Sequence, residues 1–184
     1  GNKFNFEYQY KSNGFGVTGL CYSQKLSSLY CGYKNGDLKV FQRNQSEIKF
    51  TFKVLISCLE IGKSVLFIGF NDGRFAKFGI ISNEVLLDCK CYNKPITALR
   101  IIDDLAEDAR IAVADTSTVT IRDASNGHLL HYLTIVNATI NICDIRLYNN
   151  HVIVSSNYIN DNQKCKVQIF DEMVRTYNLL KMSF

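Results

Sequence analysis

The chain has 184 residues, 47% of them apolar and 21% charged, and a formal net charge of +4. This composition is too apolar and too little charged for a disordered protein, and no apolar run approaches the roughly 20 residues of a membrane helix. The N-terminus has no basic stretch followed by an apolar segment, so no signal peptide is predicted. The length fits one domain with its own core.

The first predicted elements are short strands. Residues 3–10, KFNFEYQY, alternate between aromatic and polar side chains, which predicts a strand. Residues 17–54 divide into four further predicted strands, at about 17–22, 28–33, 37–42 and 47–54. Asn35-Gly36 separates the middle two, because Asn and Gly adopt positive φ at little cost. The flanking runs are β-branched and aromatic, which favours strands over helices.

The same pattern then repeats along the chain. Residues 66–78, LFIGFNDGRFAKF, match residues 29–41, LYCGYKNGDLKVF, without a gap. A second pattern, a β-branched residue followed by a small polar, a small and an apolar residue, begins at Val17, Ile56, Ile96 and Ile140. These starting points are 39, 40 and 44 residues apart. That period matches the roughly 40–45 residues of a four-stranded propeller blade.

Each later unit also divides into four predicted strands. They are placed at about 56–61, 65–70, 74–80 and 84–92, then 96–102, 110–115, 118–123 and 128–135, then 140–147, 151–156, 165–170 and 174–182. Residues 155–164, SSNYINDNQK, form the longest predicted hairpin connection. Their Asn and Asp content is typical of an exposed loop. Such a loop either binds a partner or is an insertion without a function that the fold tolerates.

Together the units resemble the WD-repeat family of β-propellers. The resemblance covers residues 17–184 and depends most on two glycine turns, each followed five residues later by Phe41 or Phe78, and on Ile169-Phe170-Asp171. It implies an all-β fold, a β-propeller of four-stranded antiparallel blades. Residues 1–184 would form one propeller region with blades at about 17–54, 55–95, 96–139 and 140–184.

The sequence departs from the family at its signature positions. The family's Trp-Asp pair stands here as Phe41-Gln42, Phe78-Gly79, Arg122-Asp123 and Phe170-Asp171, and the chain has no tryptophan. The family's Gly-His before each first strand is also missing. Its hydrogen-bond network of Asp, His, Ser or Thr and Trp is therefore not carried over, and we expect aromatic and aliphatic packing to hold the blades.

Four units are fewer than the roughly seven blades of a usual closed ring in this family. We therefore expect a partial ring of about four blades within a longer polypeptide, with residues 3–10 ending a preceding blade. A partial ring exposes two apolar blade faces. The missing part of the propeller, a second copy of the chain or another protein would cover them.

The cysteines and the polar motifs argue against an enzyme. Seven cysteines without a CxxC pair predict buried free thiols in a reducing compartment, the cytosol or the nucleus. Cys89 and Cys91 lie on one strand face with no second ligand pair, so no metal site is expected. No phosphate-binding glycine loop, HExxH or GxSxG motif is present, and no cofactor or catalytic residue is predicted.

The resemblance implies a non-catalytic protein-protein interaction scaffold within a larger complex. The predicted protein-binding residues follow the second strands: Tyr33, Lys34, Phe70, Asn71, Asp115, Thr116, Asn157 and Tyr158. Tyr33 and Phe70 would form an aromatic contact patch if both point outward, or would pack into the sheets. Residues 1–100 carry 14 basic and 7 acidic side chains. The alternative function is therefore binding of anionic lipid or nucleic acid by this basic half, although no basic run interleaved with aromatics supports nucleic acid.

Overall fold

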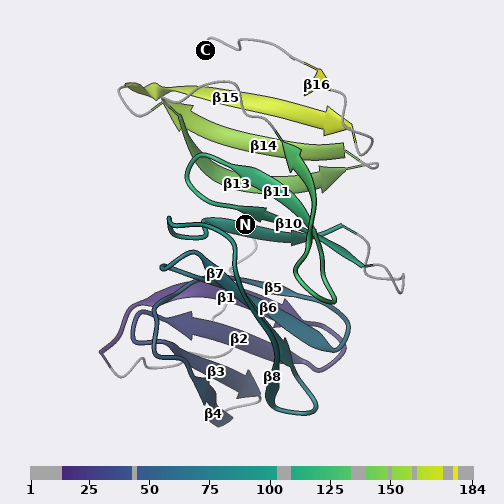
Figure 1. Ribbon diagram of the computed structural model, residues 1–184. Coiled ribbons are helices and arrows are strands. Elements are labelled where there is room, and N and C mark those ends of the chain that lie inside the picture. Colours follow the sequence, from purple (N-terminus) through teal and green to yellow (C-terminus); the bar gives the residue numbers. More distant parts are fainter. Residues whose placement is uncertain are drawn as a thin grey trace, which may run out of the picture.

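The computed structural model describes residues 14–42, 45–102, 109–133, 140–148, 151–158, 161–171 and 176–177. These residues form four antiparallel sheets of four strands, and strands that follow one another in the chain pair with each other (Figure 1). The first two sheets contain β1 (Val17–Ser23), β2 (Ser28–Tyr33), β3 (Asp37–Gln42), β4 (Gln45–Thr51), β5 (Ile56–Ile61), β6 (Val65–Phe70), β7 (Arg74–Gly79) and β8 (Glu84–Lys90). The other two contain β9 (Ala98–Ile101), β10 (Arg110–Ala114), β11 (Val119–Asp123), β12 (Leu129–Leu133), β13 (Ile140–Tyr148), β14 (His151–Tyr158), β15 (Asp161–Asp171) and β16 (Thr176–Tyr177).

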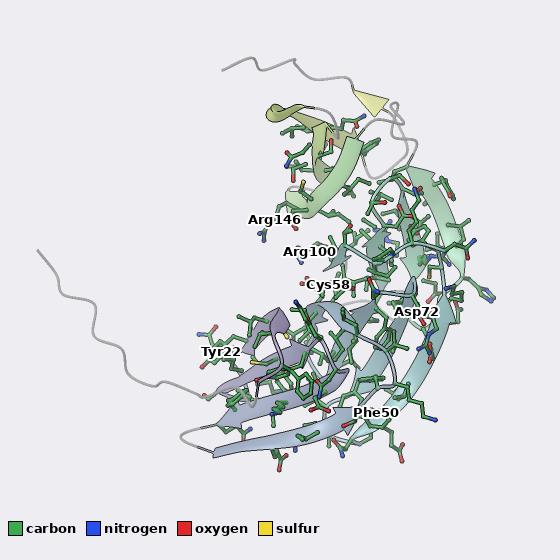
Figure 2. All side chains as sticks on the ribbon, turned by 90° about the vertical axis from the view of Figure 1, so that its left-hand side faces the viewer. Tyr22, Phe50, Cys58, Asp72, Arg100 and Arg146 are labelled. Atoms are coloured by element: carbon green, nitrogen blue, oxygen red, sulfur yellow. The ribbon has the colours of Figure 1, made fainter. Side chains whose placement is uncertain are left out.

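The sheets are arranged as the four blades of a propeller. The first strand of each later sheet packs against the first two strands of the sheet before it: β5 on β1 and β2, β9 on β5 and β6, and β13 on β9 and β10. Figure 2 shows the sheets following an arc, with Cys58 of β5 and Arg100 of β9 on its concave side. The predicted all-β propeller fold is confirmed.

Two glycines allow the tight turns that join the second and third strands. Gly36 and Gly73 have φ of 88° and 85°, a conformation that other residues rarely adopt. A Cβ atom on Gly36 would lie 2.0 Å from the carbonyl oxygen of Phe52, and one on Gly73 would lie 2.2 Å from that of Tyr92. Each glycine is therefore needed for its φ angle and for the close approach of the next backbone segment.

The predicted loop at residues 155–164 is wrong. β14 continues to Tyr158 and β15 begins at Asp161, and Asn157 pairs with Cys165. The hairpin extends because antiparallel pairing uses backbone groups, which polar Asn and Asp residues also provide. The predicted strand at 3–10 lies outside the described residues, and the blade boundaries remain a prediction.

A bulge in the first strands corrects the alignment of the fourth unit. In β1 and β5 the pairing skips one residue, after Val17 and after Ile56. In β13 the same skip comes after Ile142, not after Ile140. The backbone N–H of Ile142 also donates to the Thr116 carbonyl, much as Ile96 N–H donates to that of Phe70. Ile142, two residues later than predicted, is therefore the equivalent of Val17, Ile56 and Ile96.

The cores lie between the sheets and depend on small residues in the second strands. A Cβ atom on Gly32 would lie 2.4 Å from Cγ2 of Ile56, so only glycine leaves room for the next sheet. The hydroxyl at the bulge adds a hydrogen bond between sheets: Thr18 Oγ1 donates to the Ile56 carbonyl, and Ser57 Oγ donates to the Ile96 carbonyl at 2.6 Å. The repeated β-branched and small polar residues of the sequence thus hold consecutive sheets together.

A tyrosine network ties the second sheet to the third. Tyr92, in the segment before β9, donates its hydroxyl to the Val113 carbonyl at 2.8 Å and lies 2.7 Å from Thr120 Oγ1. Arg122, at the family's tryptophan position, donates to the Gly127 carbonyl at 2.9 Å. Burial raises the pKa of Tyr92, so it remains a neutral donor.

Candidate functional site

The turns after the second strands lie along one edge of the molecule, which we call the turn rim. It consists of residues 34–37, 52–55, 71–74, 91–97 and 115–118. Phe52 N–H donates to the Gly36 carbonyl at 2.9 Å, and Cys91 N–H donates to the Gly73 carbonyl at 3.0 Å. These bonds join each turn to the segment that leads into the next sheet, so the rim is a fixed backbone surface.

The acidic side chains of the turn rim are engaged by their neighbours. Asp37 accepts hydrogen bonds from Asn35 Nδ2 and Thr51 Oγ1, both at 2.8 Å. Asp72 Oδ2 lies 2.7 Å from Nε of Arg74. Asp115 accepts from the backbone of Ser117 and Thr118 at 2.7 Å. These contacts hold the carboxylates against the turns, and the charge of Asp72 is offset by that of Arg74, whereas the donors to Asp37 and Asp115 are neutral groups.

The lysines of the same rim point outward. Lys34, Lys53 and Lys94 are exposed. Lys94 Nζ donates to Ser117 Oγ at 3.0 Å, whereas no hydrogen bond or ion pair within the described residues engages the ammonium of Lys34 or Lys53. The turn rim therefore presents positive charge on a fixed backbone.

Of the two placements left open for Tyr33 and Phe70, the structure shows packing into the sheets. Tyr33 is 3% exposed and Phe70 is 0% exposed. Tyr33 packs with Cys31 and Phe41, and Phe70 lies in the core between the first two sheets. The Phe70 ring is covered because the second sheet packs against the first, and the Tyr33 ring is covered within the first sheet by Cys31 and Phe41. Each ring makes a cation–π contact instead. Lys39 Nζ lies 4.9 Å from the Tyr33 ring centre, and Arg74 Cζ lies 5.3 Å from the Phe70 ring centre.

The other predicted binding residues differ in their exposure. Lys34, Asn71 and Asn157 are exposed, and Thr116 is half-buried. Asp115 is buried beneath its own turn. Tyr158 ends β14, and its side chain lies outside the described part of the chain. The structure therefore leaves Lys34, Asn71 and Asn157 as the predicted residues that a partner can reach.

The sequence-based predictions missed a charged cluster on the concave side of the arc. Arg100 Nη1 lies 3.1 Å from Glu60 Oε2, and Arg100 Nη2 lies 3.0 Å from Asp144 Oδ1, so one guanidinium joins three sheets. Arg146 Nε lies 2.8 Å from the other Asp144 oxygen. Burial, partly offset by Arg100, raises the pKa of Glu60 above its ordinary value. Only the packing of the first strands of three sheets brings these residues together, so single-strand patterns could not reveal the cluster.

The cysteines of the described residues form no disulfide bond: Cys21, Cys31, Cys58, Cys89, Cys91 and Cys143. Burial raises the pKa of Cys58 to about 12, with a smaller opposing effect of its hydrogen bond from Ser57. Burial also raises the pKa of Cys31 to about 11. These two thiols are protonated at neutral pH and are poor nucleophiles. In the described residues, no three His, Cys, Asp or Glu side chains form a group that could hold a metal ion.

Comparison with known proteins identifies the fold. No family model matches the chain, and no curated protein matches it. The designed protein Ika4 superposes with a TM-score of 0.66 at 16% identity, over 86% of this chain and 94% of Ika4. The WD40 β-propeller domain of Doa1 gives 0.69 at 12% identity, over 88% of this chain and 54% of that chain. A chain of the mitotic checkpoint complex gives 0.71 at 15% identity, over 90% and 51%.

These likenesses define a class by its fold. The protein is a β-propeller with four four-stranded blades and resembles WD40 propellers in architecture. It spans about half the length of the Doa1 domain chain and of the checkpoint-complex chain. Within the described residues, no helix is long and apolar enough to cross a membrane.

Proposed function

We propose that this protein is a non-catalytic interaction scaffold, a subunit or domain of a larger complex, that binds an acidic segment of a partner protein through the turn rim. One observation carries the proposal: Lys34, Lys53 and Lys94 are exposed on this fixed rim, while the neighbouring acids are held against the turns by hydrogen bonds. Positive charge on a rigid surface attracts an acidic partner and orients it.

Two further observations support the proposal. The protein shares its fold with a WD40 domain and with a chain solved in a multi-protein complex. Its described cysteines form no disulfide bond, which suits the reducing cytosol that we propose as its location.

Binding of defined probes tests this function. The chain is titrated against a labelled peptide rich in Asp, Glu and Tyr, a labelled single-stranded oligonucleotide, and phosphatidylserine vesicles. We expect the peptide to bind, and to lose affinity as salt is added. The variant K34E/K53E/K94E should weaken peptide binding about 10-fold or more, because three ion pairs of about 0.5 kcal/mol are lost.

The matched control reverses charge on the opposite edge. Lys25 and Lys63 are exposed in the turns between first and second strands, and the variant K25E/K63E should bind the peptide like the wild type. Equal loss in both variants would show a general charge effect and contradict the proposed site. Preference for the oligonucleotide or the vesicles would favour the alternative function of the basic half.

A further inference from the structure

Two apolar residues three positions apart recur at the first strand of each sheet. In β1, β5 and β13 the first of the pair precedes the bulge, and in the third sheet it lies just before β9. On the later sheets these pairs are buried against the preceding sheet: Ile56 and Leu59, Ile96 and Leu99, and Ile142 and Ile145. Val17 and Leu20 hold the same positions on β1, yet they are 44% and 59% exposed. The first sheet thus exposes the apolar pair that each later sheet buries against the sheet before it.

The last sheet exposes the complementary surface, which in the earlier sheets is covered by the sheet that follows. In the earlier sheets, the third-strand residue opposite the small second-strand residue is fully buried by the next sheet: Leu38 opposite Gly32, Phe75 opposite Gly69, and Val119 opposite Ala114. Val167, opposite Ser155, holds this position on β15 and is 43% exposed. Arg146, on β13 of the same sheet, is also largely exposed.

These two surfaces match each other as consecutive sheets do. We call Val17, Leu20 and Tyr22 the β1 face, and Arg146, Ser155 and Val167 the β15 face. Between the first two sheets, the apolar pair of the later first strand covers the small residue of the earlier second strand, as Ile56 covers Gly32. Figure 2 shows Tyr22 at one end of the arc and Arg146 near the other, with the two ends apart.

We infer that two copies of this chain associate head to tail, each β1 face covering the β15 face of the other copy. A contact between two different faces of one molecule closes into a ring when its rotation allows, and two four-sheet arcs would form a ring of eight. The chain covers 54% of the Doa1 domain chain and 51% of the checkpoint-complex chain, so two copies supply the length of such a propeller. The contact lies away from the turn rim, so the inference does not depend on the proposed function.

The mass of the protein in solution tests the inference. Sedimentation equilibrium should give twice the chain mass of 20.9 kDa at micromolar concentration. Leu20→Glu and Val167→Glu should each raise the dimer dissociation constant at least about 100-fold, because each buries an unpaired charge in the contact. Both side chains are exposed in the single chain, so thermal melts should show that the variants still fold. Ile81→Glu, at a residue 86% exposed in the turn between β7 and β8, should remain dimeric.

Mixing the two variants tests the head-to-tail arrangement. In an equimolar mixture of L20E and V167E one of the two contacts is intact and the other is altered on both faces, so the mixture should dimerise more tightly than either variant alone and less tightly than the wild type. A wild-type monomer up to about 100 μM would overturn the inference, since a specific dimer binds more tightly. A V167E variant that remains dimeric, a mixture that dimerises no more tightly than either variant alone, or a mass above the dimer would each overturn it as well.

Discussion

Leu20 and Leu59 hold equivalent positions on the first strands of consecutive sheets, yet Leu20 is 59% exposed and Leu59 is 5% exposed. The residue type and the local backbone are the same at both positions, since each follows the bulge of its strand. The difference comes from the neighbour: β5 packs on the sheet that precedes it, whereas no described sheet precedes β1. In this fold a leucine at this position is buried by the sheet before it, so the exposure of Leu20 follows from the lack of a described sheet before β1.

The largest expected difference is in the free energy of unfolding when a buried leucine and the equivalent exposed leucine are each truncated to alanine. Leu99→Ala removes a fully buried side chain between the second and third sheets, and should lower the free energy of unfolding by about 2–5 kcal/mol. Leu20→Ala should change it by no more than about 0.5 kcal/mol at concentrations where the chain is monomeric. Urea denaturation of both variants measures the contrast. Equal losses would mean that Leu20 is already buried in the single chain.

A methyl group added between two sheets should also destabilise the protein. In Gly69→Ala the new Cβ would lie 2.6 Å from Cys58 Sγ and 2.7 Å from Ile96 Cγ2, so the third sheet must shift. We expect a loss of about 1–3 kcal/mol in urea denaturation. The control is Gly16→Ala, whose Cβ would meet only the flexible Lys34 side chain, at 3.3 Å or more. A neutral Gly69→Ala would contradict tight packing between the second and third sheets.

Removing the hydrogen bond that the Ser57 hydroxyl donates at the bulge should have a smaller effect on stability. Ser57→Ala removes the hydrogen bond to the Ile96 carbonyl and should lower the free energy of unfolding by about 1 kcal/mol. Ser64→Ala, at an exposed turn residue, provides the control and should be neutral. Equal values for the two variants would show that this bond does not help to hold the sheets together.

The charged cluster of Glu60, Arg100 and Asp144 should make the free energy of unfolding weakly dependent on pH. The pKa of Glu60 is raised in the folded state, so folding favours its protonated form. Its contribution to stability should therefore decrease as pH rises from its ordinary 4.5 towards the raised value. The stability of the wild type minus that of Glu60→Gln, measured by urea denaturation across this window, should decrease with rising pH. An increase would mean that the attraction of Arg100 outweighs the burial of the carboxylate.

The sequence allowed the hairpins of the first two sheets to be predicted closely, because their signals are local. Asn35-Gly36 and Asp72-Gly73 dictate turns by backbone conformation alone, and strands at 56–61 and 65–70 are found as predicted. The fourth unit was aligned two residues early, because Ile140 and Ile142 are both β-branched. Only the pairing of β13 with β14 reveals which of them precedes the bulge.

The candidate site was predicted less well than the fold. Lys34 and Asn71 could be placed on the rim because they follow the second strands directly. The burial of Tyr33 and Phe70 depends on contacts with residues distant in sequence, so an alternating pattern could not decide which way they face. The exposure of Val17, Leu20 and Val167 likewise depends on whether another sheet packs on their face, and the sequence of one strand carries no such signal.

Photo-cross-linking between copies tests most directly that the two ends complete each other. A benzophenone amino acid at position 167 of a ¹⁵N-labelled chain is mixed with unlabelled wild-type chain and irradiated, and the linked peptides are identified by mass spectrometry. The predicted result is a cross-link from labelled position 167 to unlabelled residues 17–23 of β1. Cross-links to β1 within the same chain only, or to another surface of the second copy, would contradict it.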